Sequence, residues 1–324
     1  MERFDHYVER ALYHPELGFY AAGGHAGRRG DFLTSPEVGP LFGAVLARAL
    51  DSWWRELGEP DPFTVVEAGA GPGTLARAVL AAEPTCGAAL RYVAVERSAA
   101  QRAAHPGEVE SRERHPEGPL TGVVLANELL DNLAFRLMER TEAGWSEVWV
   151  DRGAAVLVPL DHPPQALAGI DAAPGSRVPV QEQAAAWLAD VLALVERGRV
   201  VAVDYASTTA AMASRPVGEW LRTYRAHERG GDPVVAPGSQ DITVELALDQ
   251  LAAVRPPDRD RSQAEFLREH GLGALVEEGR RLWAERAHLG DLAAIRARSR
   301  ITEAEALCDP TGLGAFRVLE WVVG

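Results

Sequence analysis

Four short apolar runs of the sequence end in an acidic residue at the point where the chain turns polar. The four residues are Glu67, Glu96, Glu128 and Asp204. A strand that leaves the core explains one such ending, but in an open α/β sheet ligands bind beyond the carboxyl ends of the strands. Four endings therefore predict one acidic cleft, which favours a positively charged ligand.

The first run continues into a glycine-rich turn, EAGAGPGT at residues 67–74, that opens a predicted helix. Gly69, Gly71 and Gly73 lack a Cβ atom, so a ligand can approach the backbone closely. The dinucleotide pattern GxGxxG, counted from Gly69, would need a glycine where Thr74 stands. Glu67 before the glycines suits a ligand with an ammonium group and no phosphate, such as the methionine part of S-adenosylmethionine. NAD is the alternative.

Two further side chains are placed to contact such a ligand. Glu96 lies 25 residues beyond Gly71, and a carboxylate at a strand end can accept hydrogen bonds from both hydroxyls of a ribose. Asn127 closes the third run, and its amide can donate and accept hydrogen bonds. The alternative for Asn127 is a turn residue that caps backbone groups.

The composition excludes several kinds of chemistry. The 324 residues are 47% apolar and 25% charged, which is typical of a globular protein with material for more than one lobe. The formal charge is −14, and all 33 basic residues are arginine. Because there is no lysine, a lysine Schiff base and a Walker-type phosphate loop are excluded. A surface this acidic repels phosphate, so nucleic acid is not an expected partner.

Neither cysteine chemistry nor a metal site is predicted. Cys86 and Cys308 form no CxxC pair, which disfavours a disulfide framework and fits a reducing compartment. The nine histidines show no HExxH spacing. The N-terminus lacks the pattern of a signal or presequence, and no run approaches the roughly 18 apolar residues of a membrane span. We therefore expect a cytoplasmic protein with no membrane partner.

Apolar periodicity predicts the elements that position these residues. Residues 1–60 form an expected N-terminal helical cap, with a helix that starts at Ser35 and Pro36, where the serine caps it, and continues to Trp53. Residues 61–324 alternate strands and helices, which is typical of parallel strands with helical crossovers. Insertions are expected at about 135–180, with a β-hairpin, and at 206–300. The main predicted strands are 63–68, 91–97, 122–127, 199–204 and 316–323, and the main helices 74–82 and 181–196.

Several sequence blocks, in this order, resemble the MidA-type methyltransferases, bacterial relatives of the mitochondrial complex I assembly-factor protein arginine methyltransferase. The resemblance implies an α/β, Rossmann-like class I methyltransferase fold with a mostly parallel seven-stranded sheet, an N-terminal helical cap and a β-hairpin/helical insertion. It also implies S-adenosyl-L-methionine as cofactor and a protein arginine as methyl acceptor. The blocks are ALYHP at 11–15, GFY at 18–20, GDFLTSPE at 30–37, EAGAGPGTL at 67–75, NELLD at 127–131, DY at 204–205 and PGSQDIT at 237–243.

The resemblance assigns expected roles on the acceptor side. Glu128 would hold a guanidinium group through two parallel hydrogen bonds, and Asp131 or Asp241 would take the proton that methylation releases. The simpler alternative for Asp241 is a turn carboxylate. Four further residues are expected near the acceptor, although helix capping, strand closure or surface exposure would explain them as well: Asp31, Thr34, Asp204 and His227.

The chain departs from the family on this same side. It has Ala206 where the family usually has glycine, and Ala134 where the family usually has proline. Methylation of a small molecule or modified peptide is therefore an alternative to protein arginine methylation. A non-catalytic assembly or binding protein that retains the fold is an alternative of another class. The expected partner is a protein or peptide acceptor; a homodimer is permitted, and the arginine-rich segment 280–300 is a candidate partner surface.

Overall fold

The computed structural model describes residues 1–21, 34–225 and 228–324. Asp31 and His227, both expected near the acceptor, lie outside these ranges. The chain divides into two compact units. The first comprises Met1–Phe32, Glu128–Val191 and Asp204–Pro257, and the second comprises Leu33–Asn127, Leu192–Val203 and Asp258–Gly324.

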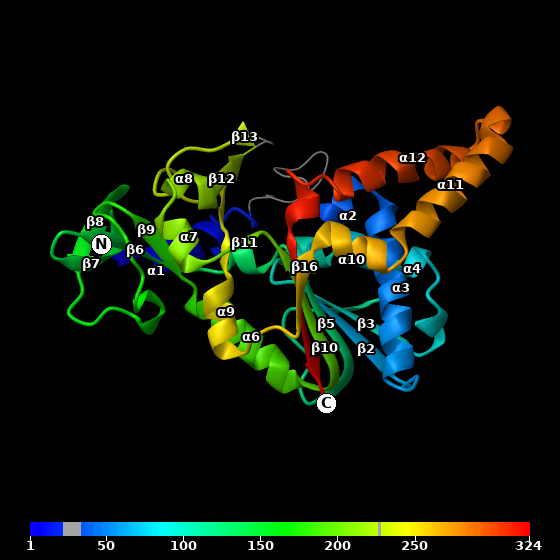
Figure 1. Ribbon diagram of the computed structural model, residues 1–324, viewed down its shortest axis with the longest axis horizontal. Helices are drawn as coiled ribbons and strands as arrows, with labels where there is room; N and C mark the ends of the chain where they lie inside the picture. The colour runs from blue at the N-terminus through cyan, green and yellow to red at the C-terminus, as the bar shows by residue number, and fades with distance from the viewer. Residues whose placement is uncertain (22–33, 226–227) are drawn as a thin grey trace. The chain divides into compact units, whose positions relative to one another are not determined.

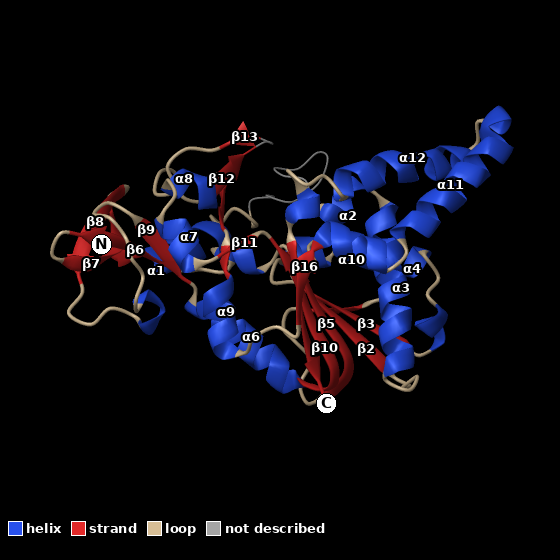
Figure 2. Ribbon diagram, viewed as in Figure 1, coloured by secondary structure: helices blue, strands red, loops and turns tan. Residues whose placement is uncertain are grey.

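The second unit is built on the predicted sheet, seen in Figures 1 and 2. Strands β10, β5, β2, β3 and β4 pair in parallel, so the expected α/β fold with a mostly parallel seven-stranded sheet is confirmed. All six residues of β2 are buried, as in a strand covered on both faces. In sheet order the strands are β16 (Arg259–Ser262), β17 (Arg317–Val323), β10 (Val195–Asp204), β5 (Leu120–Asn127), β2 (Phe63–Ala68), β3 (Leu90–Val95) and β4 (Glu110–Arg112).

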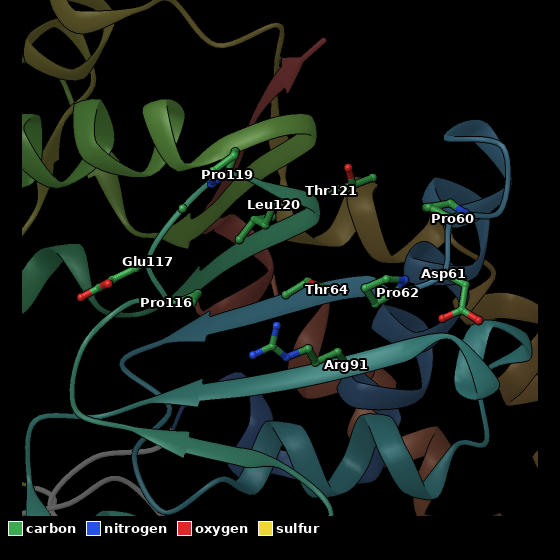
Figure 3. A pocket seen from close by; sticks show the side chains of 11 residues that line it. Pro60, Asp61, Pro62, Thr64, Arg91, Pro116, Glu117, Pro119, Leu120 and Thr121 are labelled. Atoms are coloured by element: carbon green, nitrogen blue, oxygen red, sulfur yellow. The ribbon is translucent and has the colours of Figure 1, made fainter.

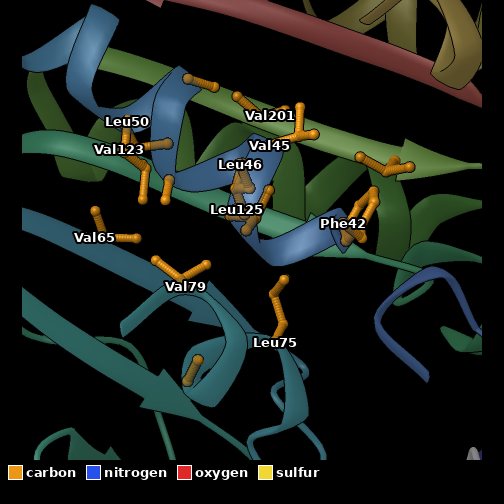
Figure 4. Close-up of a cluster of buried hydrophobic side chains, with 14 of the residues drawn as sticks. Phe42, Val45, Leu46, Leu50, Val65, Leu75, Val79, Val123, Leu125 and Val201 are labelled. Atoms are coloured by element: carbon orange, nitrogen blue, oxygen red, sulfur yellow. The ribbon is translucent and has the colours of Figure 1, made fainter. Parts of the chain in front are cut away.

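Helices α3 and α4 cover one part of this sheet with apolar side chains. Figure 4 shows Leu46 of α3 and Val79 of α4 facing the strand residues Val65 and Leu125, all of them buried. The strands thus form one side of a continuous hydrophobic core. Packing against this core fixes the positions of the carboxyl ends of the strands. The helices of this unit are α2 (Ser35–Val38), α3 (Pro40–Glu56), α4 (Thr74–Ala81), α5 (Ala99–Arg102), α10 (Gln263–Glu269), α11 (Leu272–Arg286) and α12 (Leu292–Leu307).

The helix predicted from Ser35 to Trp53 is interrupted, so that prediction is wrong in one respect. The chain leaves α2 at Gly39, whose backbone is extended, and α3 begins at Pro40. A proline disfavours the helical conformation for the residue that precedes it. The Glu303 carboxylate also lies where a Cβ at position 39 would be, and it accepts a hydrogen bond from the backbone N–H of Leu41 at 2.9 Å. Ser35 donates its hydroxyl hydrogen to Gln263 at 2.8 Å instead of capping the helix.

The first unit contains the predicted β-hairpin, β7 (Gly144–Asp151) with β8 (Ala154–Pro159), in an antiparallel five-stranded sheet with β1 (Glu2–Arg3), β6 (Arg136–Thr141) and β9 (Arg177–Val180). A second antiparallel sheet joins β12 (Leu221–Arg225), β13 (Glu228–Arg229) and β14 (Asp241–Val244). The sequence analysis did not predict this sheet, because its strands are short. The remaining elements are α1 (Phe4–Tyr13), η2 (Leu130–Asn132), η3 (Gln165–Leu167), α7 (Thr209–Ala213), α8 (Val217–Trp220), β11 (Ala206–Ser207), β15 (Leu246–Ala247) and α9 (Leu248–Val254), while α6 (Glu182–Leu194) crosses the division.

The division into units runs through the segments expected from the sequence. Residues 34–60 belong to the unit with the parallel sheet, and so do residues 258–300 of the expected second insertion. The domain boundary at residue 60 stays a sequence-based prediction. Within the described ranges, no helix combines the length and apolarity needed to cross a membrane.

A buried ion cluster fastens the edge of the parallel sheet. Glu320 of β17 is fully buried and lies between the guanidinium groups of Arg199, at 3.2 Å, and Arg261. Arg199 and Arg261 also lie over the rings of Trp53 and Phe266, at 4.9 and 5.0 Å from the ring centres. The cluster therefore satisfies a buried carboxylate with two cations.

Replacing this carboxylate tests how strongly the sheet edge depends on it. Glu320→Gln leaves two buried guanidinium groups without their shared counter-charge, so we expect a loss of about 3 to 5 kcal/mol in the free energy of unfolding. Urea denaturation measures it. The matched control is Glu56→Gln, which removes a second partner of Arg199 whose side chain is 54% exposed and should cost less than about 1 kcal/mol. Equal losses for the two variants would contradict this view of the cluster.

Candidate functional site

The carboxyl ends of the central strands lie level with one another in the parallel-sheet unit. Ala68 pairs with Val95 on one side and with Ala126 on the other, and Asn127 pairs with Val203. The predicted alignment of strand ends is therefore present up to Asn127 and Val203. Glu128 and Asp204, the next residues of the chain, belong to the other unit.

The glycine-rich turn between β2 and α4 has the backbone that its sequence predicts. Gly69, Gly71 and Gly73 have φ angles of 69°, 54° and 79°, which other residues rarely adopt. Gly73 is the N-cap of α4. A Cβ at position 71 would meet only the flexible end of Gln101, at 3.2 Å. The turn thus leaves room for a ligand at Gly71, whereas Gly73 is buried against Pro106 and His105.

Glu96 holds this turn from the end of β3. Its Oε2 accepts a hydrogen bond from the Gly71 N–H at 3.0 Å, and its Oε1 accepts one from the Ser98 N–H at 2.7 Å. The half-buried carboxylate retains lone pairs for further donors, so it fits the predicted role toward two ribose hydroxyls. His105, which the sequence analysis did not single out, also holds the turn, with its Nε2 2.8 Å from the Gly71 carbonyl oxygen.

Glu67 lies beneath the turn and faces the interior. Its side chain is 4% exposed, and its Oε2 accepts a hydrogen bond from the Tyr92 hydroxyl at 2.7 Å. Burial raises the pKa of Glu67 to about 7, against the opposing effect of the tyrosine hydrogen bond. A direct contact between Glu67 and an ammonium group stays a prediction. The hydrogen bond with Tyr92 joins the neighbouring strands β2 and β3 below the turn.

The other unit contains a cluster of three buried aspartates, at 0 to 3% exposure. Asp131 lies on η2, Asp204 ends β10 and Asp241 begins β14. Asp204 accepts a hydrogen bond from the backbone N–H of Asp131 at 3.2 Å, and Asp241 accepts one from the Asn132 side chain at 3.1 Å. The two tyrosines Tyr205 and Tyr20 donate to Asp131 and Asp241 respectively. The sequence predicted the aspartates, but not Tyr20 or Asn132.

The cluster has no cationic hydrogen-bond partner among the residues described; its partners are hydroxyl, amide and backbone N–H groups. Burial raises the pKa of Asp241 to about 7, and the charge of Asp131 adds to this effect. Burial likewise raises the pKa of Asp131 and of Asp204, the latter also because Asp131 and Glu128 lie near it. These aspartates therefore bind a proton more tightly than an ordinary carboxylate does.

Glu128 has a left-handed backbone, with φ of 50°. This conformation is uncommon for a residue other than glycine and is often found at functional sites. Its charge acts on Asp204, so it lies close to the aspartate cluster. The structure thus brings Glu128, Asp131, Asp204 and Asp241 together within one unit.

Thr34, expected near the acceptor, and a pocket on the sheet also belong to the parallel-sheet unit. Thr34 precedes α2 in the parallel-sheet unit and makes no side-chain capping bond. In the described ranges, no group of three or more His, Cys, Asp or Glu side chains could hold a metal ion. A pocket lined by Thr64, Arg91 and Thr121 lies at the amino ends of β2, β3 and β5, as Figure 3 shows, and is therefore not the site at the glycine-rich turn.

Comparisons with known proteins agree with this geometry. Residues 45–258 match the family model "Putative S-adenosyl-L-methionine-dependent methyltransferase". The chain is similar to the mitochondrial protein arginine methyltransferase NDUFAF7 of Homo sapiens, with 26% identity over 76% of this chain, and to its homolog in Drosophila melanogaster, with 28% identity over 74%. It spans 63% of the length of each. The resemblance to the MidA-type family is therefore confirmed.

Solved structures give the same result for the fold. A Burkholderia thailandensis protein crystallised with S-adenosyl-homocysteine is 30% identical, with a TM-score of 0.84 over 99% of this chain and 87% of that one. The native crystal structure of a protein from the same organism matches with a TM-score of 0.79 and the same coverage. These similarities support the methyltransferase fold over its whole extent.

The buried aspartates predict an unusual dependence of stability on pH. The folded protein binds a proton at Asp241 more tightly than the unfolded chain does, so ionised Asp241 destabilises the fold progressively as pH rises from about 4 to about 7 and above. At pH 8, Asp241→Asn should raise the free energy of unfolding by at most about 4 kcal/mol. The gain should vanish near pH 4. Thermal unfolding at both pH values measures it.

The control for loss of one negative charge is Asp171→Asn, at an exposed position of the same unit. It should leave the stability unchanged within about 0.5 kcal/mol at both pH values. An Asp241→Asn variant that is less stable than wild type at pH 8 would show that the carboxylate is ionised and stabilising.

Proposed function

The chain belongs to this family of S-adenosyl-L-methionine-dependent methyltransferases, and we propose that it transfers the methyl group of that cofactor to the guanidinium group of a protein arginine. The carrying observation is the group of buried acidic side chains that have no cationic hydrogen-bond partner in the described chain. A guanidinium group would supply the missing positive charge and hydrogen-bond donors. The names of the mitochondrial relatives support the same acceptor.

The turn at 67–74 and Glu96 are the residues that would hold the cofactor. Gly71 leaves room for a ligand beside its backbone, and Glu96 offers lone pairs to the ribose hydroxyls. When bound, the cofactor supplies a methyl group on a positively charged sulfur, and its carbon–sulfur bond breaks, with the electron pair kept by sulfur, as the acceptor nitrogen bonds the carbon. Such a displacement requires nitrogen, carbon and sulfur in line.

Glu128 would orient the acceptor. A guanidinium group is fully protonated near neutral pH, and its lone pairs are delocalised. Two parallel hydrogen bonds to one carboxylate fix the plane of the group and draw positive charge toward the bonded nitrogens. The remaining nitrogen is then richer in electron density and better able to attack the methyl carbon.

Asp131 or Asp241 would take the proton. The methylated nitrogen must lose one proton so that the product carries a single positive charge. A carboxylate with a raised pKa holds that proton better than an ordinary surface carboxylate does, and it later releases the proton to water. Each transfer thus yields one methylguanidinium, one demethylated cofactor and one proton.

Incubation with labelled S-adenosyl-L-methionine and a cell lysate tests the proposal. Label recovered as methylarginine after hydrolysis of the protein fraction supports it. Label in the small-molecule fraction, or on another amino acid, would show that the acceptor is not a protein arginine. A protein that binds S-adenosyl-homocysteine but transfers no label to any fraction would be a binding protein that has kept the fold.

The role of Glu128 is tested by Glu128→Gln. The amide has the same shape but carries no negative charge, so we expect the transfer rate to fall at least about 100-fold, while the affinity for S-adenosyl-homocysteine, measured by calorimetry, stays within about two-fold. Glu142→Gln, at an exposed turn of the same unit, is the charge control and should retain full activity. The assignment is wrong if Glu128→Gln keeps most of the wild-type turnover.

A further inference from the structure

Tyr205 is held rigidly next to Asp131. Its hydroxyl donates a hydrogen bond to Oδ2 of Asp131. Its backbone N–H donates to Asp204 at 3.0 Å, and its carbonyl oxygen accepts from the Leu246 N–H at 3.0 Å. The guanidinium group of Arg222 lies 5.5 Å from the centre of its ring. Backbone and ring are therefore both fixed, and the hydroxyl has a defined position.

Tyr20 stands in a similar relation to Asp241. Its hydroxyl lies 3.2 Å from Oδ1 of Asp241 and 3.1 Å from Oδ1 of Asn132. The Asn132 amide donates to the same Asp241 oxygen at 3.1 Å and to the Ile242 carbonyl at 3.2 Å. Three donors, including the Ile242 N–H at 3.0 Å, thus meet at one oxygen of Asp241.

In each aspartate the second oxygen is left without a partner. Oδ1 of Asp131 and Oδ2 of Asp241 are buried and accept no hydrogen bond from the described chain. A buried oxygen without a hydrogen-bond donor destabilises the charged carboxylate more than the neutral acid, which can carry its hydrogen there. One oxygen of each residue is thus fixed, and the other is open to a proton.

We propose that Tyr205 and Tyr20 are positioning residues for proton transfer, each holding one oxygen of Asp131 or Asp241 so that the other oxygen receives the proton released by the acceptor. This inference rests on the proposed methyl transfer to a guanidinium group. It extends that function to the Tyr205 and Tyr20 hydroxyls. Neither hydroxyl reacts, but each determines which aspartate oxygen accepts the proton and how readily it does so.

The tyrosine hydroxyl also sets how basic the aspartate is. A hydrogen bond to the ionised form favours ionisation and so lowers the pKa of Asp131, against the larger effect of burial. Loss of the hydroxyl should raise that pKa further. The charged and titratable groups near Asp131 lie between β5 and η2, at and just after the end of β10, on β12 and β14, and in the turn after α1. They are Glu128, Asp204, Tyr205, Arg222, Asp241 and Tyr20.

Tyr205→Phe tests the proposal through the pH dependence of methyl transfer. A base must be ionised to accept a proton, so the acid limb of the rate profile, measured with labelled cofactor and the lysate protein fraction, should move up by about one pH unit. The rate at pH 6 should fall about five-fold relative to wild type, and the rate at pH 9 should stay within about two-fold. Tyr20→Phe should act in the same direction through Asp241.

Tyr7→Phe is the matched control. The Tyr7 hydroxyl, in the same unit, donates at 3.0 Å to the backbone carbonyl of Pro233, and among the described residues it donates to no carboxylate. Its removal should leave the profile in place. A Tyr205→Phe variant whose rate falls by one factor at every pH, or whose acid limb does not move, would overturn the proposal, because a purely structural role has that effect.

An acceptor-independent measurement separates this inference from the proposed function. Carbon-13 NMR of labelled aspartate carboxyls, with Asp131→Asn to assign the signal, reports the pKa of Asp131 in the wild type and in Tyr205→Phe. An upward shift with methylarginine formed supports both ideas. An upward shift of the Asp131 pKa without methylarginine supports the positioning role of Tyr205 and contradicts arginine as the acceptor. Methylarginine without a shift removes only the positioning role.

Discussion

The cost of burying a carboxylate governs both units of this protein. A buried carboxylate requires either a cation or enough hydrogen-bond donors, and otherwise becomes protonated. The chain uses both solutions. Glu320 lies between two arginines, and Glu245 pairs with Arg215 and Arg222. The aspartate cluster, in contrast, is surrounded by hydroxyl, amide and backbone donors.

This contrast supports the proposed role of the aspartate cluster. Arginine is not the only partner of a buried structural acid, because Glu303 accepts hydrogen bonds from the Leu41 N–H at 2.9 Å and from the Ser299 hydroxyl at 2.7 Å. Within the described residues no ion pair neutralises the aspartate cluster, and Arg222 acts on Asp131 only through its charge. In the proposed function a cationic acceptor and a transferable proton would neutralise it. The same reasoning applies at the strained backbone of Glu128, since strain persists where function requires a fixed direction.

The sequence predicted the parallel sheet and the cofactor turn because both depend on local patterns. Valine-rich runs specify β2, β5 and β10, and glycines with positive φ specify the turn. It predicted the aspartates through a family resemblance, but not their partners. Tyr20 and Asn132 are 112 residues apart in the chain, and only the fold brings them together. The break at Gly39 was missed because Glu303, which occupies it, comes from a distant helix.

The proposed binding site for S-adenosyl-L-methionine consists of the glycine-rich turn at 67–74 and the carboxylate of Glu96 at the end of β3. Calorimetric titration of the whole chain with S-adenosyl-homocysteine, in parallel with NAD, tests it most directly. The account predicts saturable binding of S-adenosyl-homocysteine that weakens about ten-fold or more in Glu96→Gln, with no heat from NAD. Binding of NAD in place of S-adenosyl-homocysteine, or equal affinity in the Glu96 variant, would contradict it.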